Sequence, residues 1–507
     1  MPLHRTYAFR TSAVKRDNDF DWNSKNPTNF AKLAPSTSIN WTPCFKNFTC
    51  MNLEVPLDYG NSSSGTIAIA FIKLAAQNIS ENTQDILINP GGPGGSGVEL
   101  VQVFGSVWQE VIGTEHNIIG FDPRGVGNSG PIVDCFPGHP EARAHFESIF
   151  YPDVSNASST SVDTQFYAAH LFGTWCNENA GNASFISTPA VARDMLTYIM
   201  AEQKAANKSV EEAKLSYYGT SYGSALGVTF ASLFPDKVRR VVVDGVIDTE
   251  DYYNLGWRDN LYQADEALQS FSSYCFQGGE SNCSFWGPSA QNISNRLHKI
   301  VADLKYHPIP VAHSEACPLP MLATYSDLKQ LMIEAMYNSL SGFPLLSDLL
   351  VALEQRNGSA VIAAVTQWSI PANPCNNGTV GNTVDSGTLI KCVDGWNGTH
   401  FKTIEEYQGY VDTLMNQSKF FGEVWPNNAN GVSCRSFEMQ PPESGMLPGS
   451  IMQTKNTSFP LLFISMTDDP VAPIRGAYKM SAVFPGSIVL AQKGVSVSLK
   501  SSQYPVI

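Results

Sequence analysis

The feature that most restricts how this chain can fold is a Gly-Thr-Ser-Tyr-Gly turn at residues 219–223. An apolar, strand-like run at 214–218 leads into this turn, and small residues at 224–231 continue from it as a helix-like segment. Glycine at both ends removes side chains that would clash in such a tight strand-to-helix turn. A strained turn of this kind lifts the serine hydroxyl above the edge of a sheet. Ser221 is therefore predicted to be a nucleophile, rather than part of an ordinary glycine-rich turn.

The other apolar runs of the chain predict a mostly parallel sheet. Each run is short and ends in a loop rich in glycine or aspartate, and a helical stretch often follows it. Strands that are buried on both faces, with crossover helices between them, have this pattern. The strand-like runs are 66–74, 85–89, 116–121, 214–218, 238–244, 459–465 and 486–491.

A long interval, 245–455, separates two late members of this series. Its pattern is helix-rich, for example at 262–274, 323–338 and 345–355, so it is predicted to be a helical cap inserted between two strands. The predicted division of the chain is a non-domain segment at 1–18, a first core part at 19–245, the cap at 246–455, a second core part at 456–492 and an aberrant tail at 493–507.

A second glycine-rich segment, Asn-Pro-Gly-Gly-Pro-Gly-Gly-Ser-Gly at 89–97, directly follows a strand-like run. Acyl transfer requires two N–H donors aimed at the oxyanion that develops in the transition state. Because consecutive glycines let the backbone approach a substrate, Gly92 is predicted to supply one donor and the amide of Tyr222 the other. A phosphate-binding loop is the rival interpretation, but the segment has no Gly-Lys-Ser/Thr end and its prolines remove N–H groups.

Four motifs, in this order, resemble the α/β-hydrolase serine exopeptidases of the prolyl and tripeptidyl aminopeptidase group. They are PGGPGGSG, FDPRGVGNSG, YYGTSYG and DDPVAP, and the segments DFDW and WTPC…CMNLEVPLDYG are similar to the secreted tripeptidyl-aminopeptidase-like branch. The resemblance extends over residues 19–492. It implies an α/β-hydrolase fold and hydrolysis of peptides, or of related amides and esters, from the N-terminal end.

The acid of a catalytic triad is expected on the loop after the run at 459–465, where Thr-Asp-Asp-Pro-Val follows. The resemblance implies that Asp469, immediately before Pro-Val, is this acid and would orient a histidine. Asp468 is the alternative. Asp122 and Arg124, in the FDPRG motif, are predicted to be a structural pair in their loop.

The triad histidine is missing from the place that the resemblance implies. A Gly-His-Cys-like loop is expected within a few residues of Gln492, but 493–507 read KGVSVSLKSSQYPVI and all nine histidines precede Asp469. One explanation is a missed exon boundary near Gln492, so that the tail is translated intron. Another is that the chain is a pseudo-enzyme or a binding protein. A third is that a cap histidine, such as His313 or His400, takes the role.

The missing base has consequences for the chain as written. Ser221 would be a poor nucleophile without a general base. The oxyanion hole and substrate binding alone leave a residual acceleration of ~10³–10⁴-fold. The 507-residue polypeptide is therefore expected to be nearly inactive, whereas the intact gene product would be a serine exopeptidase. The final helix of the fold is also missing, so uncovered apolar sheet surface and poor stability are expected.

The cysteines and asparagines indicate the secretory route. None of the 10 cysteines forms a C-x-x-C pair, and close pairs such as Cys44/Cys50 and Cys275/Cys283 are typical of short disulfide loops. N-x-S/T glycosylation sequons are dense. They begin at Asn40, Asn47, Asn61, Asn78, Asn156, Asn182, Asn207, Asn282, Asn292, Asn357, Asn377, Asn397, Asn416 and Asn456. Residues 1–22 lack the apolar core of a signal peptide. The true start is therefore expected to be missing from this sequence, and unconventional secretion is the alternative.

The composition excludes several classes of partner. A net charge of −14 repels phosphate backbones, so no nucleic-acid partner is expected. No apolar run approaches the ~18 residues that span a bilayer, so no membrane partner is expected. No cofactor and no metal are predicted, because histidines do not occur at zinc-ligand spacing from the cysteines. A peptide substrate is the predicted partner, and the oligomeric state is left open.

Substrate choice is expected to lie in the cap. An aminopeptidase needs a carboxylate for the free amino group, but each candidate is better explained as a solvated surface charge, and none is assigned. The candidates are Glu250, Asp251, Asp265, Glu266 and Glu280. Two alternatives to an exopeptidase are a secreted esterase or lipase, and a non-catalytic secreted binding protein.

Overall fold

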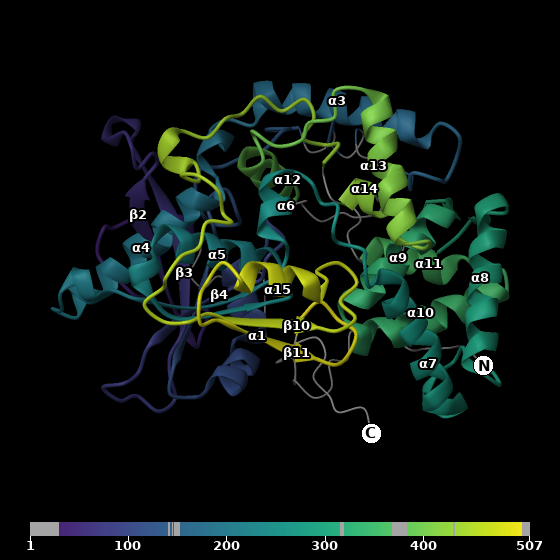
Figure 1. Cartoon of the computed structure of the whole chain (residues 1–507), viewed down its shortest axis with the longest axis horizontal. Helices are drawn as coiled ribbons and strands as arrows, with labels where there is room; N and C mark the ends of the chain where they lie inside the picture. Colours follow the sequence, from purple (N-terminus) through teal and green to yellow (C-terminus); the bar gives the residue numbers. More distant parts are fainter. Residues whose placement is uncertain are drawn as a thin grey trace.

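The computed structural model describes residues 30–139, 142–143, 146, 153–314, 319–367, 383–428 and 431–498. Figure 1 shows a sheet covered by helices and, beside it, a large helical region made by the middle of the chain. The predicted segment 1–18 lies outside the described residues.

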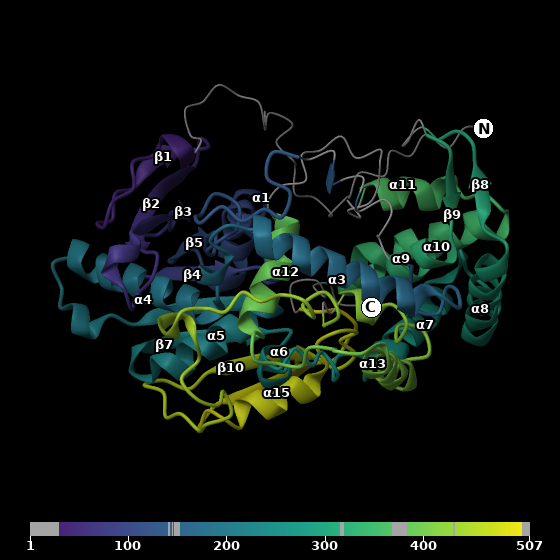
Figure 2. The same ribbon diagram turned by 90° about the horizontal axis from the view of Figure 1, so that it is seen from above.

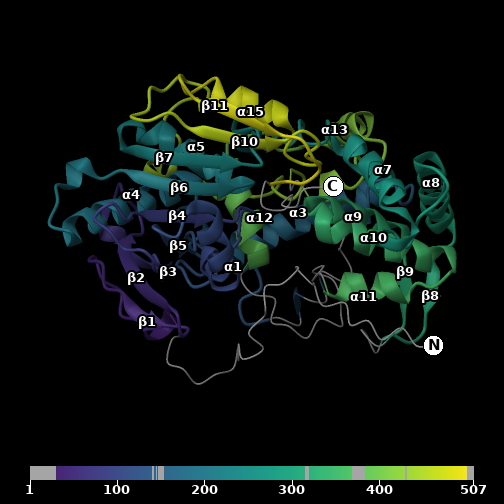
Figure 3. The same ribbon diagram turned by 90° about the horizontal axis from the view of Figure 1, so that it is seen from below.

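The core contains a nine-stranded sheet, counted over the described residues, with the order β1-β2-β3-β5-β4-β6-β7-β10-β11 (Figure 3). The first three strands pair antiparallel, and from β5 to β11 all neighbours are parallel. The predicted, mostly parallel sheet is therefore confirmed. The strands are β1 (Thr42–Cys44), β2 (Phe48–Pro56), β3 (Thr66–Leu74), β4 (Asp85–Asn89), β5 (Asn117–Phe121), β6 (Leu215–Thr220), β7 (Val238–Asp244), β10 (Leu462–Met466) and β11 (Ile488–Gln492).

Helices cover both faces of this sheet. Trp108 of α1 (Gly97–Ile112) packs with Ile118 in the core on one face. On the other face, α4 (Thr188–Ala205), α5 (Tyr222–Leu233) and α15 (Ile474–Ser481) share a core with Phe463. Burial on both faces explains why the central strands are nearly continuous apolar runs.

The edge strand β11 is less well covered. Its Ile488 and Leu490 side chains are 65% and 49% exposed, so apolar sheet surface is open to water there. The poor stability expected from such a surface stays a prediction.

The interval between β7 and β10 forms most of the helical region, with one short hairpin of β8 (Ile309–Val311) and β9 (Met321–Ala323). Its helices are α6 (Thr249–Tyr253), α7 (Ala264–Asn282), α8 (Ala290–Tyr306), α9 (Tyr325–Tyr337), α10 (Ser339–Glu354), α11 (Ser359–Gln367), α12 (Thr383–Asp394), α13 (Ile404–Gln417) and α14 (Trp425–Asn428). In Figures 1 and 2, α7 to α11 group at the end of the molecule away from β1 to β3, and α6 and α12 lie nearer the sheet.

One helix from the predicted first core part lies against this cap. Helix α3 (Ser161–Asn179), between β5 and β6, packs on α13. The Tyr407 hydroxyl donates to Gln165 at 2.6 Å, and the rings of Tyr407 and Phe166 stack 6.3 Å apart. The cap surface is thus built from two separate stretches of chain. The predicted cap, 246–455, does not include α3. The boundaries at 245/246 and 455/456 stay predictions.

The prediction that Asp122 and Arg124 form a pair is wrong, although both are buried and structural. The Arg124 guanidinium instead donates two hydrogen bonds to Asp194 of α4, at 2.6 and 2.7 Å. Asp122 accepts from the Ser96 hydroxyl at 2.5 Å and from the Asn128 amide at 2.9 Å. The motif therefore ties its loop to two different helices.

Four disulfides join described cysteines: Cys44–Cys50, Cys135–Cys176, Cys275–Cys283 and Cys392–Cys434. They include both short loops that the spacing predicted, whereas Cys317 and Cys375 lie outside the described residues. Every described sequon asparagine is exposed except Asn292, which is half-buried, and Asn377 is not among the described residues. These features are consistent with an extracellular protein. None of the helices described is both long and apolar enough to cross a membrane.

Candidate active site

Ser221 lies at the sharp turn between β6 and α5, as predicted from the glycine pattern. Its backbone has φ 55° and ψ −121°, a conformation that non-glycine residues adopt only under strain. A Cβ on Gly219 would lie 2.3 Å from the Gly223 carbonyl oxygen, so the turn requires glycine. The Ser221 amide donates to the Asp244 carbonyl at the end of β7, at 2.9 Å. These constraints leave the half-buried serine at the carboxyl edge of the sheet.

The glycine-rich loop after β4 lies directly against this turn. A Cβ on Gly91 would lie 2.4 Å from the Thr220 carbonyl oxygen and 3.0 Å from the Ser221 Cβ. The Gly91 amide already donates to Asn89 at 2.9 Å. The next residue, Gly92, is exposed, and its amide has no hydrogen-bond partner among the described residues. The loop thus leaves the predicted donor, the Gly92 amide, available. Gly91 is the glycine that lets the loop approach the turn at Ser221, and the sequence did not distinguish it from Gly92.

Tyr222 supplies the other predicted donor from the first residue of α5. Its amide lies at a helix N-terminus, where the backbone N–H groups have no partner within the helix and the helix dipole favours negative charge. Its side chain is buried, and the hydroxyl contacts that of Thr188. Whether Gly92 and Tyr222 bind an oxyanion stays a prediction.

Asp469 lies on the loop after β10 and is fully buried. Its Oδ1 accepts hydrogen bonds from the amides of Val471 and Ala472, at 2.9 and 2.7 Å. Its Oδ2 is buried and has no partner among the described residues. Burial is the main reason that the pKa of Asp469 is raised to about 8, and the charge of Asp244 adds to the effect. Asp468 is only half-buried, so Asp469 matches the expected acid better.

The described histidines do not contact Asp469. The two ring nitrogens of His400 lie 3.0 and 3.1 Å from the carbonyl oxygens of Cys434 and Trp396. His313 is exposed in the loop after β8. Neither of the two cap histidines considered as substitutes therefore serves the acid in this structure.

The beginning of the predicted aberrant tail packs beside the acid loop. The Asp468 amide donates to the Gly494 carbonyl at 3.1 Å, and the Ser496 hydroxyl donates to the Tyr337 carbonyl in the cap at 2.9 Å. Val495 and Val497 are buried in the core that also contains the acid loop. Residues 494–497 therefore connect the acid loop to the cap, whereas 499–507 lie outside the described residues. Whether the tail is native stays a prediction.

Comparison with known proteins agrees with this arrangement of strands and turns. The α/β hydrolase fold family matches residues 86–282, which include the glycine-rich loop and the turn at Ser221. This chain contains an α/β-hydrolase domain.

The hydrolase is similar to peptidases over most of its length. It is 24% identical to serine protease Hip1 of Mycobacterium tuberculosis over 469 residues, which cover 89% of this chain and 84% of that protein. It is 26% identical to tripeptidyl aminopeptidase of Streptomyces coelicolor over 481 residues, 91% of this chain and 81% of the relative. Carboxylesterase B of M. tuberculosis is 26% identical over 374 residues, 71% of this chain and 66% of that protein.

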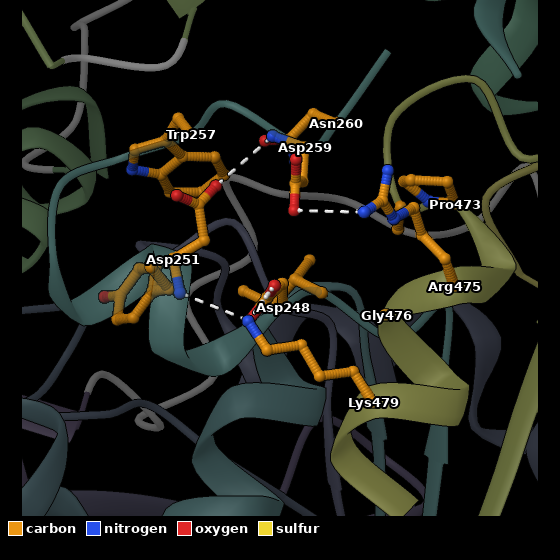
Figure 4. A pocket seen from close by; sticks show the side chains of 12 residues that line it. Asp248, Asp251, Trp257, Asp259, Asn260, Pro473, Arg475, Gly476 and Lys479 are labelled. Carbon is orange, nitrogen blue, oxygen red and sulfur yellow. Dashed lines mark hydrogen bonds and ion pairs between the residues drawn. The ribbon is translucent and has the colours of Figure 1, made fainter. Parts of the chain in front are cut away.

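A cavity of about 270 Å³ lies beside the acid loop of the hydrolase, between α6 and α15 (Figure 4). Asp251, one of the candidate amine anchors, lines it, and burial raises the pKa of Asp251 to about 6. However, Asp251 accepts the Arg258 amide at 2.7 Å, and Glu250 pairs with Lys479 at 2.8 Å. Asp265 accepts the Lys419 amide at 2.9 Å. These three candidates therefore have local structural partners. The remaining two, Glu266 and Glu280, are exposed.

Glu334 of α9 is a cap carboxylate that the sequence did not single out. Water reaches its side chain, yet the surrounding protein raises its pKa to about 7. Burial raises the pKa of Tyr337, and the charges of Glu334 and Asp469 add to the effect, so both carboxylates act electrostatically on that hydroxyl. No sequence motif marks Glu334. Among the described residues, no group of three or more His, Cys, Asp or Glu side chains could hold a metal.

Proposed function

We propose that this hydrolase is a secreted serine exopeptidase that removes N-terminal residues or tripeptides through an acyl-enzyme on Ser221. The observation that carries the proposal is the buried, unpartnered Oδ2 of Asp469. A buried carboxylate oxygen without a donor is costly, unless a group such as a histidine N–H binds there. Its place on the loop after β10, two strands from β6, which leads into Ser221, supports the role of a triad acid.

The chemistry proposed for the site begins when Ser221 Oγ forms a bond to the scissile carbonyl carbon and its proton passes to a base. The carbonyl electron pair becomes an oxyanion, which the amides of Gly92 and Tyr222 would stabilise. Collapse breaks the C–N bond, the amine leaves with the proton, and water hydrolyses the acyl-enzyme. Since no described histidine contacts Asp469, we expect the 507-residue polypeptide to hydrolyse amides very slowly.

Glu334 supports a peptide with a free amino group as the substrate. Water reaches the Glu334 side chain, and the surrounding protein raises its pKa to about 7, so a bound ammonium ion would offset the cost of its negative charge. The relatives named as a serine protease and a tripeptidyl aminopeptidase favour the same class. The relative named carboxylesterase B keeps an esterase as the second candidate. The four disulfides and the exposed sequons support secretion.

Substrate binding requires no histidine. A binding measurement on the 507-residue chain can therefore test the substrate class. Calorimetric titration with trialanine amide and with its N-acetylated form should show at least ~10-fold tighter binding of the free amine. Glu334→Gln should remove this preference, whereas Glu250→Gln, at a carboxylate already paired with Lys479, should keep it. Equal affinity for the two peptides would exclude the exopeptidase and favour the esterase.

A fluorophosphonate probe tests the nucleophile separately. We expect slow labelling of the chain at Ser221 and none in Ser221→Ala. Absence of any labelling at Ser221 would favour the non-catalytic binding protein. Brisk amide hydrolysis that Ser221→Ala abolishes would contradict the expected low activity, and would mean that another base activates the serine.

A further inference from the structure

A buried chain of hydrogen bonds links the cap to the residue after Ser221. Asp394, the last residue of α12, accepts the Thr188 amide on Oδ1 at 2.7 Å and the Thr188 hydroxyl on Oδ2 at 2.5 Å. The Thr188 hydroxyl in turn contacts the hydroxyl of Tyr222. The Tyr252 hydroxyl donates to the same Oδ2 at 2.7 Å. Four helices, α12, α4, α5 and α6, therefore meet at one carboxylate.

The direction of these hydrogen bonds depends on whether Asp394 is ionised, and burial raises its pKa to about 7. Above that pKa the ionised carboxylate can only accept, so Thr188 donates to it and Tyr222 donates to Thr188. Each hydroxyl polarises the next, which strengthens the set beyond its separate bonds. All four side chains are nearly inaccessible to water, and no Lys or Arg among the described residues forms an ion pair with Asp394. The hydroxyls of Thr188 and Tyr252 and the Thr188 amide therefore offset part of the cost of burying the negative charge.

The contacts of the Tyr222 hydroxyl are important because the backbone amide of the same residue is the proposed oxyanion donor. Ser221 has a strained conformation, which persists only where neighbouring groups restrain it. The Tyr222 ring is held at its hydroxyl by Thr188 and along its face by Tyr252, with ring centroids 5.6 Å apart. Both contacts restrain the first turn of α5, whose first amide is the proposed oxyanion donor.

We propose that Asp394 is a positioning residue, which holds Tyr222 through Thr188 and thereby aligns the amide that follows Ser221. The proposal rests on the function proposed above. It assigns the cap a role in transition-state stabilisation, in addition to substrate choice. Among the described residues, Asp394 bonds Thr188 and Tyr252 but not Ser221, so its proposed effect on the site passes through Tyr222.

The first test uses hydrolysis of p-nitrophenyl acetate by the 507-residue chain, because residual catalysis without a base depends on the oxyanion hole. Loss of a whole oxyanion donor costs ~10²–10³-fold in kcat, so a misaligned donor in Asp394→Asn or Tyr222→Phe should cost about 10- to 100-fold, with KM within about twofold. The double variant should lose no more than the stronger single variant. Thr188→Ser should keep the rate, and Thr188→Val should not.

Asp385→Asn is the matched control. Asp385 is a second buried carboxylate of α12, but it bonds Arg143 and the Cys135 amide rather than α5. Asp385→Asn should lower the stability of the fold and leave kcat per folded molecule unchanged. An unchanged kcat in folded Asp394→Asn and Tyr222→Phe would overturn the proposal, as would an equal loss in Asp385→Asn.

Hydrogen exchange of the first turn of α5 separates this proposal from the function on which it rests. Asp394→Asn and Tyr222→Phe should each speed exchange at the amides of residues 222–226, and Asp385→Asn should not. If the unmodified chain fails to hydrolyse the ester above the buffer rate, the proposed function fails, and exchange alone then decides. Unchanged exchange at 222–226 would overturn the role of Asp394 even if the chain is active.

Discussion

The two halves of the candidate site, the turn at Ser221 and the loop at Asp469, differ in how many of their polar groups have partners. At the turn after β6, Ser221 is fixed by its own backbone bond to Asp244, by the close approach of Gly91 and by the burial of Tyr222. At the loop after β10, one oxygen of Asp469 accepts two amides while the other has no partner among the described residues. The contacts around Ser221 are enough to hold the turn, whereas Oδ2 of Asp469 still requires a hydrogen-bond donor.

The two halves also differ in charge. Ser221 carries a neutral, half-buried hydroxyl, so its burial costs little free energy. Asp469 is a fully buried carboxyl group, and a charge there without a cation is expensive. The difference implies that mutations at the turn should act mainly on reactivity, and that mutations at the acid should act mainly on the pH dependence of stability.

The largest effect is expected from Gly91→Val at the nucleophile turn. The new side chain would collide with Thr220 and Ser221, and the residue has φ 91°, which valine adopts poorly. We expect ester hydrolysis and phosphonate labelling to fall ~10²–10³-fold, as when an oxyanion donor is lost. Gly65→Ala is the control, because it has φ 86° but no atom within 4 Å of the new Cβ. Equal losses in the two variants would mean that backbone strain, not contact with Ser221, is responsible.

The next effect concerns the acid loop and pH. The pKa of Asp469 is about 8 in the folded chain and 3.8 without the fold, so the native state keeps a proton that the unfolded state releases. Stability should therefore fall as pH rises through this window and level off above pH 8. Asp394 and Glu334, with pKa values of about 7, act in the same direction and remain in the variant. Relative to Asp469→Asn, the unmodified chain should lose about 2–3 kcal/mol between pH 6 and 9.

Chemical denaturation at several pH values measures this difference. A parallel pH dependence in the two proteins would mean that Asp469 is already stabilised as an anion, so that its Oδ2 has a donor after all. That result would remove the contrast between the two halves of the site.

The smallest effect is a gain of activity. Val495 and Val497 are buried in the same core as the acid loop, so we expect a histidine at one of these positions to reach Oδ2 of Asp469. Val495→His or Val497→His should raise Ser221-dependent hydrolysis about 10-fold, well below the range of an evolved general base because the ring is not pre-aligned. The gain should disappear in combination with Asp469→Asn. A gain that survives that second change would show that the acid loop has no part in it.

Much of the fold could be predicted from the sequence because its signals are local. The runs at 66–74, 85–89 and 238–244 coincide with β3, β4 and β7, since β-strand pattern and turn glycines act over a few residues. The turn at Ser221 was predictable for the same reason: only glycine fits at Gly219. The pairing of Arg124 with Asp194 was not, because the two residues lie 70 positions apart.

What the sequence by itself determined is the sheet, the nucleophile turn and the glycine-rich loop beside it. Only the tertiary structure decided that α3 joins the cap, that the pKa of Glu334 is raised and that Asp394 connects the cap to Tyr222. It also decided that Asp469 is buried with one oxygen unpartnered. The physical reason is that burial and hydrogen-bond satisfaction depend on atoms that distant segments bring together, and no spacing along one segment encodes them.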